Sequence, residues 1–365
     1  MKITIITVSY NSADTIEKTI QSVIAQKFHD VEYIIVDGGS TDHTAEIIRK
    51  YKDNICVYIS EPDQGIYDAM NKGLGRATGE IVAFLNSDDW YLPNILSRVE
   101  QYFNNNRADI VSGGIYVCRD EECVKAPHRR VVDENVFFDI VCPHPAMFVK
   151  RELYVQLGKF DTSYEIAADT KWIMDAYVKG SHILCVDDYF TCFRDGGVSS
   201  LRKLEAWKEQ YRAAITCIKE NHLTELVQKA DDFYQKKIRE AETEKRVEIV
   251  LAQRPGQVKS LFQFPGGCYI WGTGVRGKRC KDIFERSGIP IAAFIDSYRT
   301  QEQIGQYRVI APAEIEGERH ICITPGNYEK EILTQLMEMG IEANQVFTYT
   351  DMLETIGTLC ADDYK

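Results

Sequence analysis

Apolar and polar segments alternate along the first part of the chain in the way that is typical of α/β proteins. Short apolar runs rich in β-branched residues predict strands at Ile3–Val8, Val31–Val36, Ile55–Ile59 and Ile81–Leu85. Between the strands, apolar residues recur at three- and four-residue steps, which predicts helices. Strands that are almost entirely apolar and joined by helices indicate a largely parallel sheet that is covered on both faces.

The pattern from residue 105 to residue 200 is less regular. It predicts strands at Asp109–Val117 and Ile183–Val186, helices at Arg151–Leu157 and Ala168–Lys179, and a glycine-containing loop at Phe193–Ser200. We assign residues 1–200 to one α/β domain.

The composition changes after residue 200, where glycine and proline disappear and charged residues, glutamine and alanine dominate. Apolar residues at helical spacing predict two or three helices there. The mixed signs of the charges favour a solvated spacer or hairpin over a membrane-surface helix. Pro255-Gly256 ends this segment, and a second series of alternating strands and helices follows. We therefore predict a helical connector over residues 201–256 and a small α/β domain over residues 257–365.

The net charge limits the partners. The 365 residues include 43 Lys and Arg against 55 Asp and Glu, a formal charge of −12. This balance argues against nucleic acid as a partner, because neutralising phosphates needs a basic surface. No stretch reaches the roughly eighteen uncharged apolar residues of a membrane span, and the N-terminal apolar run is interpreted as a buried strand rather than a signal peptide. We expect a cytoplasmic location, with peripheral contact to the inner membrane face left open.

The cysteines show no framework. Eleven is an odd number, and they are scattered without regular spacing. The plain interpretation is reduced thiols in the cytoplasm. Cys118, Cys123 and His128 come nearest to a metal-binding cluster, but neither a CxxC motif nor a second ligand pair accompanies them. Structural zinc is therefore not expected.

Polar side chains follow the predicted strands at their carboxyl ends, where ligands bind in open parallel α/β sheets. Asp37 follows the second strand, and Asn86-Ser87-Asp88-Asp89 follows the strand that ends at Leu85. Adjacent carboxylates raise each other's cost of ionisation, and a hard divalent cation that also binds phosphate oxygens would relieve the repulsion. The alternative is that an aspartate caps the helix expected after Trp90.

Several short motifs occur in one order along this part of the chain. They are Thr7-Val8-Ser9-Tyr10-Asn11, Val36-Asp37-Gly38-Gly39-Ser40-Thr41-Asp42, Asn71-Lys72-Gly73, Gly79-Glu80 and Phe84-Leu85-Asn86-Ser87-Asp88-Asp89. The series resembles glycosyltransferase family 2, the inverting enzymes with the GT-A fold, over roughly residues 1–200. The stretch Glu61–Gly73 looks like the branch that builds bacterial capsules, O-antigens and exopolysaccharides. The resemblance implies a mixed α/β GT-A sheet flanked by helices, and sugar transfer from a nucleotide diphosphate.

The resemblance assigns roles on the donor side. Thr7, Tyr10 and Asp37 would hold the nucleobase and ribose, with Asp37 accepting hydrogen bonds from the base. Asp88 and Asp89 occupy the family's Asp-x-Asp position. One would ligate Mg²⁺ or Mn²⁺, and the other would hold the ribose or a metal-bound water.

Further positions near the nucleotide have two interpretations. Asn86 stands where the family often has the first aspartate of the motif, which leaves open which of the two aspartates binds the metal directly. Asn71 and Lys72 would lie beneath the nucleotide, or cap and solvate their own helix. Arg194 would lie on a loop that closes over the diphosphate and balances its charge, or be a surface arginine.

An inverting transfer also needs a base that takes the proton of the acceptor hydroxyl. In the segment Gly158–Trp172, Asp169 falls at the family's position for that base, with Glu165 and Asp161 as further candidates. Asp169 would also serve as the cap of the following helix, and the two roles are compatible. His144 matches a position that lines the acceptor side, or is a structural histidine. The reaction would be a single displacement without a covalent sugar–enzyme step.

The predicted second domain carries Gly272-x-Gly274-x-x-Gly277 between a strand and a helix, with Asp296 after the next strand. That is the context of a dinucleotide fingerprint, and the segment resembles the small Rossmann-like modules found beside sugar-modifying enzymes. Two roles stay open, a second nucleotide or nucleotide-sugar site and a packing or oligomerisation module. No Tyr-Lys or Cys-His arrangement supports an oxidoreductase.

We therefore expect a metal-dependent inverting hexosyl- or N-acetylhexosaminyltransferase of surface polysaccharide synthesis. Its donor would be a nucleotide sugar, in the first place a UDP-sugar, and its acceptor a saccharide, in particular a lipid-linked one. A nucleotidyltransferase would need a glycine-rich basic loop after the first strand, and Ser9–Ala13 is neither. The alternative is a non-catalytic nucleotide-sugar sensor with the C-terminal domain as its active module. The set of Asp37, Asp88, Asp89 and Asp169 argues against it.

Overall fold

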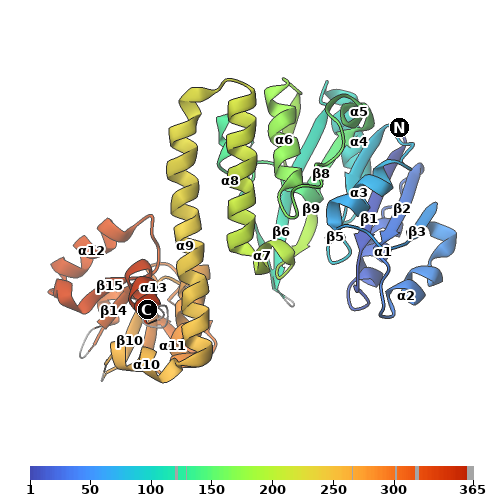
Figure 1. The fold of residues 1–365 in the computed structure, drawn as a ribbon. Coiled ribbons are helices and arrows are strands. Elements are labelled where there is room, and N and C mark those ends of the chain that lie inside the picture. The colour runs from blue at the N-terminus through green and yellow to red at the C-terminus, as the bar shows by residue number, and fades with distance from the viewer. Residues whose placement is uncertain (120–121, 129, 265, 301, 317–319, 360–365) are drawn as a thin grey trace. The chain divides into compact units, whose positions relative to one another are not determined.

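The computed structural model describes residues 1–119, 122–128, 130–264, 266–300, 302–316 and 320–359. The chain divides into two compact units, Met1–Ile238 and Arg239–Lys365. This division falls inside one long helix, α9 (Val227–Gln253) (Figure 1). The predicted division at residues 200 and 256 into separately folding domains stays a prediction.

The first unit is built on a sheet with strand order β3-β2-β1-β4-β8-β6-β9-β5, in which β7 also pairs with β6. Its parallel part consists of β1 (Ile3–Ser9), β2 (Val31–Asp37), β3 (Val57–Ser60) and β4 (Ile81–Phe84). β1 lies between β2 and β4. The apolar runs of the sequence form these strands because both faces of this part are buried.

The remaining strands make the sheet mixed. β8 (Met147–Lys150) runs antiparallel to β4 and to β6 (Ile110–Arg119). β9 (Ile183–Arg194) runs parallel to β6. β5 (Trp90–Tyr91) pairs antiparallel with β9, and β7 (Glu122–Lys125) pairs antiparallel with β6.

The loop predicted at Phe193–Ser200 is partly regular. Its first two residues continue the pairing of β9 with β6, and Val198–Leu201 forms the short helix α7. The strand therefore extends to Arg194. Short 3-10 helices fill other connections of this unit, at Lys52–Asn54, Glu134–Phe137, His144–Ala146 and Thr224–Leu226.

Helices cover both faces of the first sheet (Figure 1). In β1, Ile3 and Ile5 belong to the core on one face and Ile6 and Val8 to the core on the other, because successive side chains of a strand alternate. The helices on the face of Ile3 are α1 (Ile16–Ile24), α2 (Thr44–Lys50) and α4 (Ile95–Asn105), and those on the face of Ile6 are α3 (Ile66–Leu74), α5 (Arg151–Leu157), α6 (Ala168–Val178) and α8 (Lys203–Glu220).

The predicted connector forms the helices α8 and α9, which pack side by side as in the hairpin alternative (Figure 1). It is not fully solvated, because part of it belongs to the core of the first unit. Ala213, Ala214 and Ile218 of α8 are fully buried, and the rings of Trp207 and Tyr234 pack against each other. The apolar residues at helical spacing supply this buried face, while the charges that suggested a spacer are compatible with the rest of the helix surface. Among the described residues, no helix is long and apolar enough to cross a membrane.

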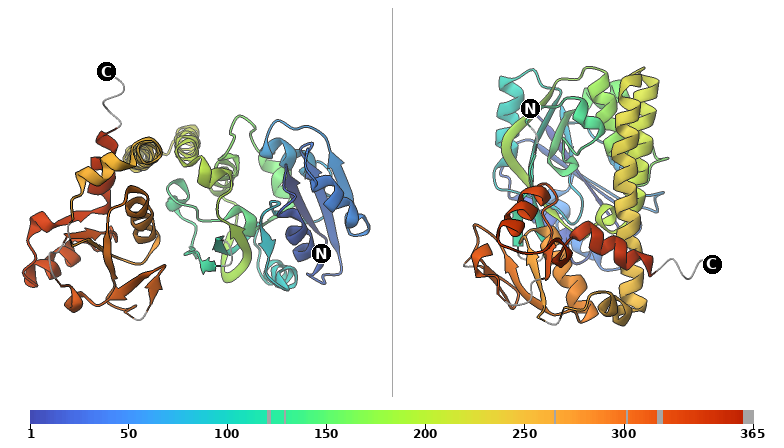
Figure 2. Two further views of the ribbon diagram at one scale, coloured as in Figure 1. Left: turned by 90° about the horizontal axis from the view of Figure 1, so that it is seen from below. Right: turned by 90° about the vertical axis from the view of Figure 1, so that its left-hand side faces the viewer.

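The second unit is built on a smaller sheet, drawn in orange and red in Figure 2. Its strand order is β12-β13-β11-β10-β14-β15. Its strands are parallel except β12, which pairs antiparallel with β13. The first parallel strand lies at the centre, as in a doubly wound sheet, and helices cover both faces. The elements are α10 (Pro255–Leu261), β10 (Cys268–Trp271), α11 (Val275–Ser287), β11 (Ile291–Ile295), β12 (Gln303–Ile304), β13 (Tyr307–Ile310), β14 (His320–Ile323), α12 (Glu329–Glu338), β15 (Val346–Thr348), α13 (Tyr349–Thr358) and 3-10 helices at Pro312–Glu314 and Ala343–Gln345.

Cys118 and Cys123 form a disulfide between paired residues of the β6–β7 hairpin. The expectation that the cysteines are reduced is therefore wrong for this pair, because the register that places them opposite each other is a property of the hairpin. His128, which the sequence groups with them, instead has its Nε2 2.8 Å from the Val186 carbonyl oxygen.

Candidate active site

The carboxyl ends of β1, β2 and β4 meet at one edge of the first sheet, because these strands are parallel neighbours. Side-chain hydrogen bonds join the loops that follow them. Asn11 Oδ1 accepts a bond from the Thr41 backbone N–H at 2.9 Å, and the hydroxyls of Ser12 and Ser87 lie 2.8 Å apart. The structure thus brings most of the predicted donor-side residues to a single edge.

Asp37 ends β2 and is fully buried. Its carboxylate accepts bonds from the hydroxyls of Ser9, Ser40 and Ser60 at 3.4, 2.5 and 2.8 Å, and from the Ser40 N–H at 3.2 Å. Both oxygens are therefore engaged in holding the strand ends together. The predicted contact with the nucleobase stays a prediction, and it would require a serine to give way.

Thr7 does not lie with these residues. Its side chain is fully buried, and its hydroxyl is 3.1 Å from the hydroxyl of Tyr33 in the core. Ser9, two residues further along the same face of β1, is the neighbour of Asp37. Thr7 lies two residues before the end of β1, and its predicted contact with the nucleotide stays a prediction. Tyr10, by contrast, is 63% exposed just beyond the strand.

Asp63 belongs to this edge and was missed in the sequence. A Cβ on Gly38 would lie 2.4 Å from Asp63 Oδ2, so a glycine is needed for the carboxylate to approach the loop after β2. Asp63 Oδ1 accepts a bond from the Gly65 N–H at 2.9 Å. The Asp63-Gln64-Gly65 turn within the recognised motif was the available signal.

The segment after β4 is a tight turn, closed by a bond from the Asp89 N–H to the Asn86 carbonyl at 3.1 Å. The next residues form β5, and α4 begins only at Ile95. Neither aspartate therefore caps a helix, which removes the alternative considered above. The Thr19 hydroxyl donates to the Asp89 carbonyl at 2.7 Å and fixes the turn against α1.

Two buried acceptor oxygens of this turn, Asn86 Oδ1 and Asp89 Oδ2, have no hydrogen-bond partner among the described residues. Asp89 is fully buried, and burial together with the charge of Asp88 raises the pKa of its carboxyl well above the usual range. Burial also raises the pKa of Asp88. Unpartnered acceptors beside two carboxylates form a set of oxygen donors that suits a hard cation. The residues present therefore fit Mg²⁺ or Mn²⁺.

Arg194 ends β9 beside this turn. Its backbone N–H donates to Asp89 Oδ1 at 3.0 Å. Its guanidinium makes no ion pair within the described part of the chain, and its charge acts to lower the pKa of Asp88 against the effect of burial. A Cβ on Gly197 would lie 3.6 Å from Asp88 Oδ2. The segment from Arg194 to Gly197 thus lies against the aspartates and presents a guanidinium that has no ion pair within the described ranges.

The two carboxylate oxygens of Asp169 have different surroundings in the first turn of α6. Oδ1 accepts bonds from the Tyr67 hydroxyl and from the Thr170 N–H, both at 2.8 Å. Oδ2 lies 3.9 Å from His144 Nδ1, and the side chain is 25% exposed. The N-cap of α6 is Ala167, so Asp169 is not the cap. One oxygen is held in place, and the other is able to take up a proton.

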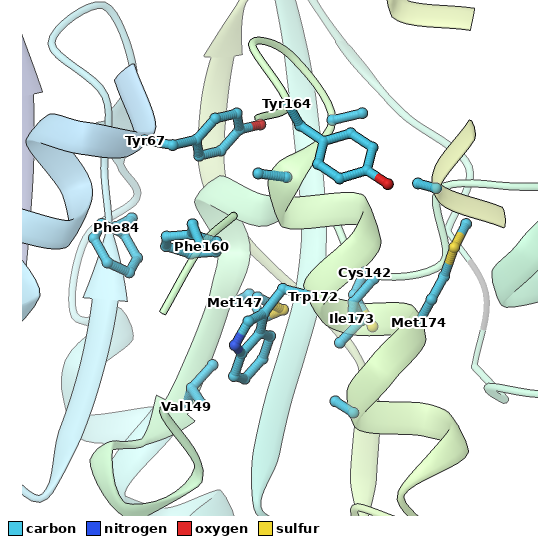
Figure 3. Packing of buried hydrophobic residues seen from close by; sticks show 14 of the residues in the cluster. Tyr67, Phe84, Cys142, Met147, Val149, Phe160, Tyr164, Trp172, Ile173 and Met174 are labelled. Atoms are coloured by element: carbon cyan, nitrogen blue, oxygen red, sulfur yellow. The ribbon is translucent and has the colours of Figure 1, made fainter. Parts of the chain in front are cut away.

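Tyr67, from α3, is a second residue that sequence reasoning missed. Burial and the neighbouring Asp169 raise the pKa of its hydroxyl well above the usual range, so it remains a donor at neutral pH. Its ring lies 5.6 Å from that of Phe160, which is 5.3 Å from Phe84 and 6.3 Å from Trp172 (Figure 3). This aromatic group fixes the approach of α3 to α6.

His144 connects the acceptor side to the aspartate turn. Its ring stacks on Phe84, the last residue of β4, at a centroid distance of 5.4 Å. Burial lowers the pKa of the imidazole, with Asp169 acting in the opposite direction, so the ring is neutral at neutral pH. Its Nε2 is buried without a partner in the described ranges. The predicted acceptor-side position of His144 is consistent with this geometry.

Glu209 of α8 holds the loop that leads into α6. Its carboxylate accepts bonds from the backbone N–H groups of Glu165, Ile166 and Ala167 at 2.9, 2.7 and 3.0 Å. The side chain of Glu165 forms an ion pair with Arg202 at 2.8 Å and is not placed as a base. Glu209 was missed because it lies in the segment interpreted as a spacer.

Asn71 and Lys72 bind protein groups. Asn71 Nδ2 donates to the Phe160 carbonyl at 2.9 Å, and its Oδ1 accepts from the Phe160 N–H at 3.0 Å. Lys72 pairs with Glu61 at 3.1 Å and Asp68 at 3.4 Å. The amide of Asn71 thus joins α3 to the loop before α6, and its predicted contact with the nucleotide stays a prediction.

The predicted second site lies at the carboxyl ends of β10 and β11. Gly272 has φ +111°, and a Cβ on Gly277 would lie 2.0 Å from the Gly272 carbonyl oxygen, so both positions require glycine. Gly274 is the N-cap of α11. The Thr273 hydroxyl donates to Asp296 Oδ2 at 2.9 Å. The glycines and Asp296 are thus together, and nucleotide binding there stays a prediction.

Residues 4–164 match the family model described as Glycosyl transferase family 2. The chain carries a family 2 glycosyltransferase domain at its N-terminus. Residues 267–347, in the second unit, match a model described as C2185-like, N-terminal. An uncharacterized glycosyltransferase of Mycobacterium tuberculosis is 29% identical to the chain over 178 residues, which are 48% of this chain and 68% of that protein.

Solved structures resemble the family 2 domain and its surroundings. S. aureus TarS 1-349 in complex with UDP-GlcNAc has a TM-score of 0.51 at 18% identity, covering 72% of this chain and 80% of that one. A mannosyltransferase from Pyrobaculum calidifontis in complex with GDP-Man and Mn²⁺ has a TM-score of 0.50 at 18% identity, covering 78% and 84%. At these identities the similarity is one of fold, and the expected GT-A fold is confirmed.

Proposed function

We propose that the first unit is an inverting glycosyltransferase that takes a sugar from a nucleotide diphosphate with a divalent cation at the Asn86–Asp89 turn. The observation that carries this proposal is the pair of buried, unpartnered oxygens, Asn86 Oδ1 and Asp89 Oδ2, beside the partly exposed Asp88. A purely structural turn would pair such atoms with protein donors. A cation and the groups that it binds would supply the missing partners.

Asp88 is the residue that we assign as the direct metal ligand. Its carboxylate is partly exposed, whereas Asp89 is buried and has one oxygen bonded to the Arg194 N–H. When bound, the cation would neutralise the diphosphate and so stabilise the leaving group. Asp89 Oδ2 would hold a ribose hydroxyl or a water. The Mn²⁺ bound to the mannosyltransferase of similar fold supports the choice of metal.

The nucleoside would lie along the ends of β1 and β2. Tyr10 offers an exposed ring for the base and Asp63 offers a carboxylate. Arg194 offers the diphosphate a guanidinium that has no ion pair among the described residues. UDP-GlcNAc in the TarS complex supports a UDP-sugar as the donor. A hexosyl or N-acetylhexosaminyl group is then the transferred sugar.

Asp169 is the general base in this proposal. Its Oδ2 would take the proton of an acceptor hydroxyl while that oxygen attacks the anomeric carbon opposite the departing diphosphate. Tyr67 and the Thr170 N–H keep Oδ1 in place, and the neutral His144 lies beside Oδ2. A single displacement inverts the anomeric configuration and needs no covalent sugar–enzyme step.

The acceptor that we propose is a lipid-linked saccharide of surface polysaccharide synthesis, met at the inner face of a membrane. The stretch Glu61–Gly73 of this chain resembles the polysaccharide-building branch of the family. Val198 and Leu201 are 57% and 78% exposed and follow directly on the segment Arg194–Gly197. Exposed apolar side chains next to a donor site suit an acceptor presented at a lipid surface.

Calorimetric titration of UDP, GDP and TDP, each with and without Mn²⁺, tests the donor part of this proposal. We expect one nucleotide, UDP in the first place, to bind at least about tenfold more tightly with the metal. Slow hydrolysis of the matching nucleotide sugar without acceptor would establish catalysis and exclude a non-catalytic sensor. Equal affinities with and without metal for all three nucleotides would contradict the proposal.

A further inference from the structure

Three cysteine sulfurs meet beside the aspartate turn of the first unit. Cys118 lies near the end of β6, Cys123 in β7 and Cys192 in β9, and their Sγ atoms all lie within 4.8 Å of one another. Cys118 and Cys123 are joined in a disulfide, and Cys192 is a free thiol. Cys123 is exposed, whereas the other two are buried. A free thiol thus packs against a disulfide that solvent reaches on one side.

This hairpin supports the segment that holds Asp89. The Asp195 N–H donates to the Cys118 carbonyl at 2.9 Å, and Arg119 Nε donates to Asp195 Oδ2 at 2.6 Å. The preceding residue, Arg194, donates its own N–H to Asp89 Oδ1 at 3.0 Å. The Asp89 carboxylate is therefore held by Arg194, and the next residue, Asp195, is held by the disulfide hairpin.

Cys192 reaches the same turn from the opposite direction. It is the partner of Trp90 in the pairing of β9 with β5, and Trp90 follows Asp89 directly. A covalent change at Cys118 or at Cys192 consequently acts on a neighbour of Asp89. These are independent connections, one through the β6–β7 hairpin and one through β5.

We propose that Cys118, Cys123 and Cys192 form a thiol–disulfide exchange site for small thiols and small disulfides, and that its state controls the aspartate turn. The exchange chemistry does not depend on the proposed glycosyl transfer. The effect on donor binding rests on that proposed function.

The exchange within the protein balances without an external oxidant. The Cys192 thiolate attacks Cys118 Sγ, a Cys118–Cys192 bond forms, and the Cys118–Cys123 bond breaks. Cys123 leaves with the electron pair and takes up a proton from water, replacing the proton that Cys192 released. A small thiol enters the same cycle when its thiolate attacks the exposed Cys123 Sγ and Cys118 is displaced, which leaves a mixed disulfide on Cys123.

The surroundings make this exchange slow but directed. Burial raises the pKa of the Cys192 thiol, while the nearby ammonium group of Lys18 favours the thiolate. Thiolates are the attacking species, so Cys192 reacts through a minor population. The short distance between Cys192 Sγ and the disulfide compensates for the small fraction of thiolate, since the attack is intramolecular.

Peptide mapping without reduction tests the exchange. Trypsin cleaves after Arg119 and so separates the two hairpin cysteines, which makes the disulfide visible as a pair of linked peptides. In Cys123→Ser, treatment with oxidised glutathione should form a mixed disulfide on Cys118. Cys192 should then displace glutathione and give a Cys118–Cys192 link. Glutathione retained on Cys118 with Cys192 free would overturn the proposal.

The double variant Cys123→Ser/Cys192→Ser is the matched control and should keep glutathione on Cys118. The exposed free thiol of Cys56 reports that the reagent acted. Stoichiometric zinc in the reduced wild-type protein would also overturn the proposal, because the three thiolates would then form a metal site.

Binding of UDP with Mn²⁺ tests the control of the aspartate turn. We expect affinity to fall roughly tenfold when the hairpin disulfide is reduced, and by a similar factor in Cys118→Ser/Cys123→Ser without reductant. Unchanged affinity in both would overturn this part. Absence of UDP binding in the oxidised wild type would count against the proposed glycosyl transfer alone, since the peptide map reports the exchange independently.

Discussion

Each unit of this chain carries an aspartate-bearing edge of a parallel sheet, and the two edges differ in how their polar groups are satisfied. In the first unit, Asn86 Oδ1 and Asp89 Oδ2 are buried and have no hydrogen-bond partner in the part of the chain that the structure describes. In the second unit, Asp296 accepts bonds from the Thr273 hydroxyl and the Tyr298 N–H, both at 2.9 Å. No buried side-chain atom of Thr273 or Asp296 lacks a partner in the described structure.

The difference shows that strand-end aspartates do not by themselves indicate a metal site. Asp296 has its donors within the protein, so its edge is complete as folded. In the first unit the pKa is raised at both Asp88 and Asp89, and no donor of the described residues reaches Asn86 Oδ1 or Asp89 Oδ2. An unsatisfied buried acceptor is costly, and binding of a cation or its ligands offsets that cost.

Asp169→Asn should have the largest effect on the rate of transfer. It should also distinguish the acceptor side, where Asp169 lies, from the proposed donor site at the ends of β1, β2 and β4. The amide keeps the acceptor for Tyr67 and Thr170 but cannot take a proton, so transfer should fall roughly 10²–10⁴-fold. Donor affinity should stay within about threefold, since the donor edge is unchanged. Initial rates and UDP calorimetry on one preparation provide the check. Transfer at the wild-type rate would remove Asp169 from the proposal.

Asp88→Ala and Asp296→Ala form a matched pair that tests whether the metal binds at the edge of the first unit and not at that of the second. We expect Asp88→Ala to weaken Mn²⁺-dependent UDP binding by about a hundredfold, since the loss of a group that only supports a metal ligand already costs about 10- to 100-fold. Asp296→Ala should leave that binding unchanged. Calorimetry of both variants with UDP and Mn²⁺ is the measurement. Equal losses in the two would mean that the comparison does not locate the metal.

Tyr67→Phe should lower transfer by roughly tenfold, because one hydrogen bond to the Asp169 carboxylate is lost while the ring is retained. The maximal rate should fall with little change in the apparent affinity for the donor. Tyr58→Phe is a suitable control, since its hydroxyl is buried without a partner in the described ranges. A Tyr67→Phe protein that loses donor affinity instead would place the tyrosine on the donor side.

Asp89→Asn should give the smallest effect, a change in melting temperature relative to wild type that has opposite signs with and without metal. Because the pKa of Asp89 is raised in the folded protein, the unfolded chain releases this proton first as pH rises. Stability is therefore lost between the ordinary carboxyl range, near roughly pH 4, and the raised value. The asparagine avoids this loss, so the metal-free variant should melt a few degrees higher at neutral pH and like wild type in acid.

Calorimetric melting with and without Mn²⁺ checks this last prediction. Added Mn²⁺ should raise the melting temperature of the wild type more than that of Asp89→Asn, because binding of metal favours the ionised carboxylate. A variant less stable than wild type without metal at neutral pH would show that the Asp89 charge is satisfied by protein groups.

Much of the edge at the carboxyl ends of β1, β2 and β4 could be predicted from the sequence, and the errors of that prediction have a local cause. Alternation of apolar residues located the strands, so Asp37, Asp88 and Asp89 were correctly expected after strand ends. Thr7 lies two residues before the strand end, and its side chain is buried in the core, a position that the motif alone did not reveal. The helices of residues 201–256 were expected, but their buried face was not, because mixed charges on one face of a helix do not reveal the burial of the other.

The sequence by itself determined that carboxylates follow the parallel strands. Parallel strands place their carboxyl ends on one edge of the sheet, independently of the conformation of the loops. Only the tertiary structure decided which acceptors there lack partners, because satisfaction depends on donors from distant segments. Tyr67 reaches Asp169 across 102 residues, and Arg194 reaches Asp89 across 105. Such contacts follow from the packing of α3 on α6 and of β9 on β5, which no local pattern encodes.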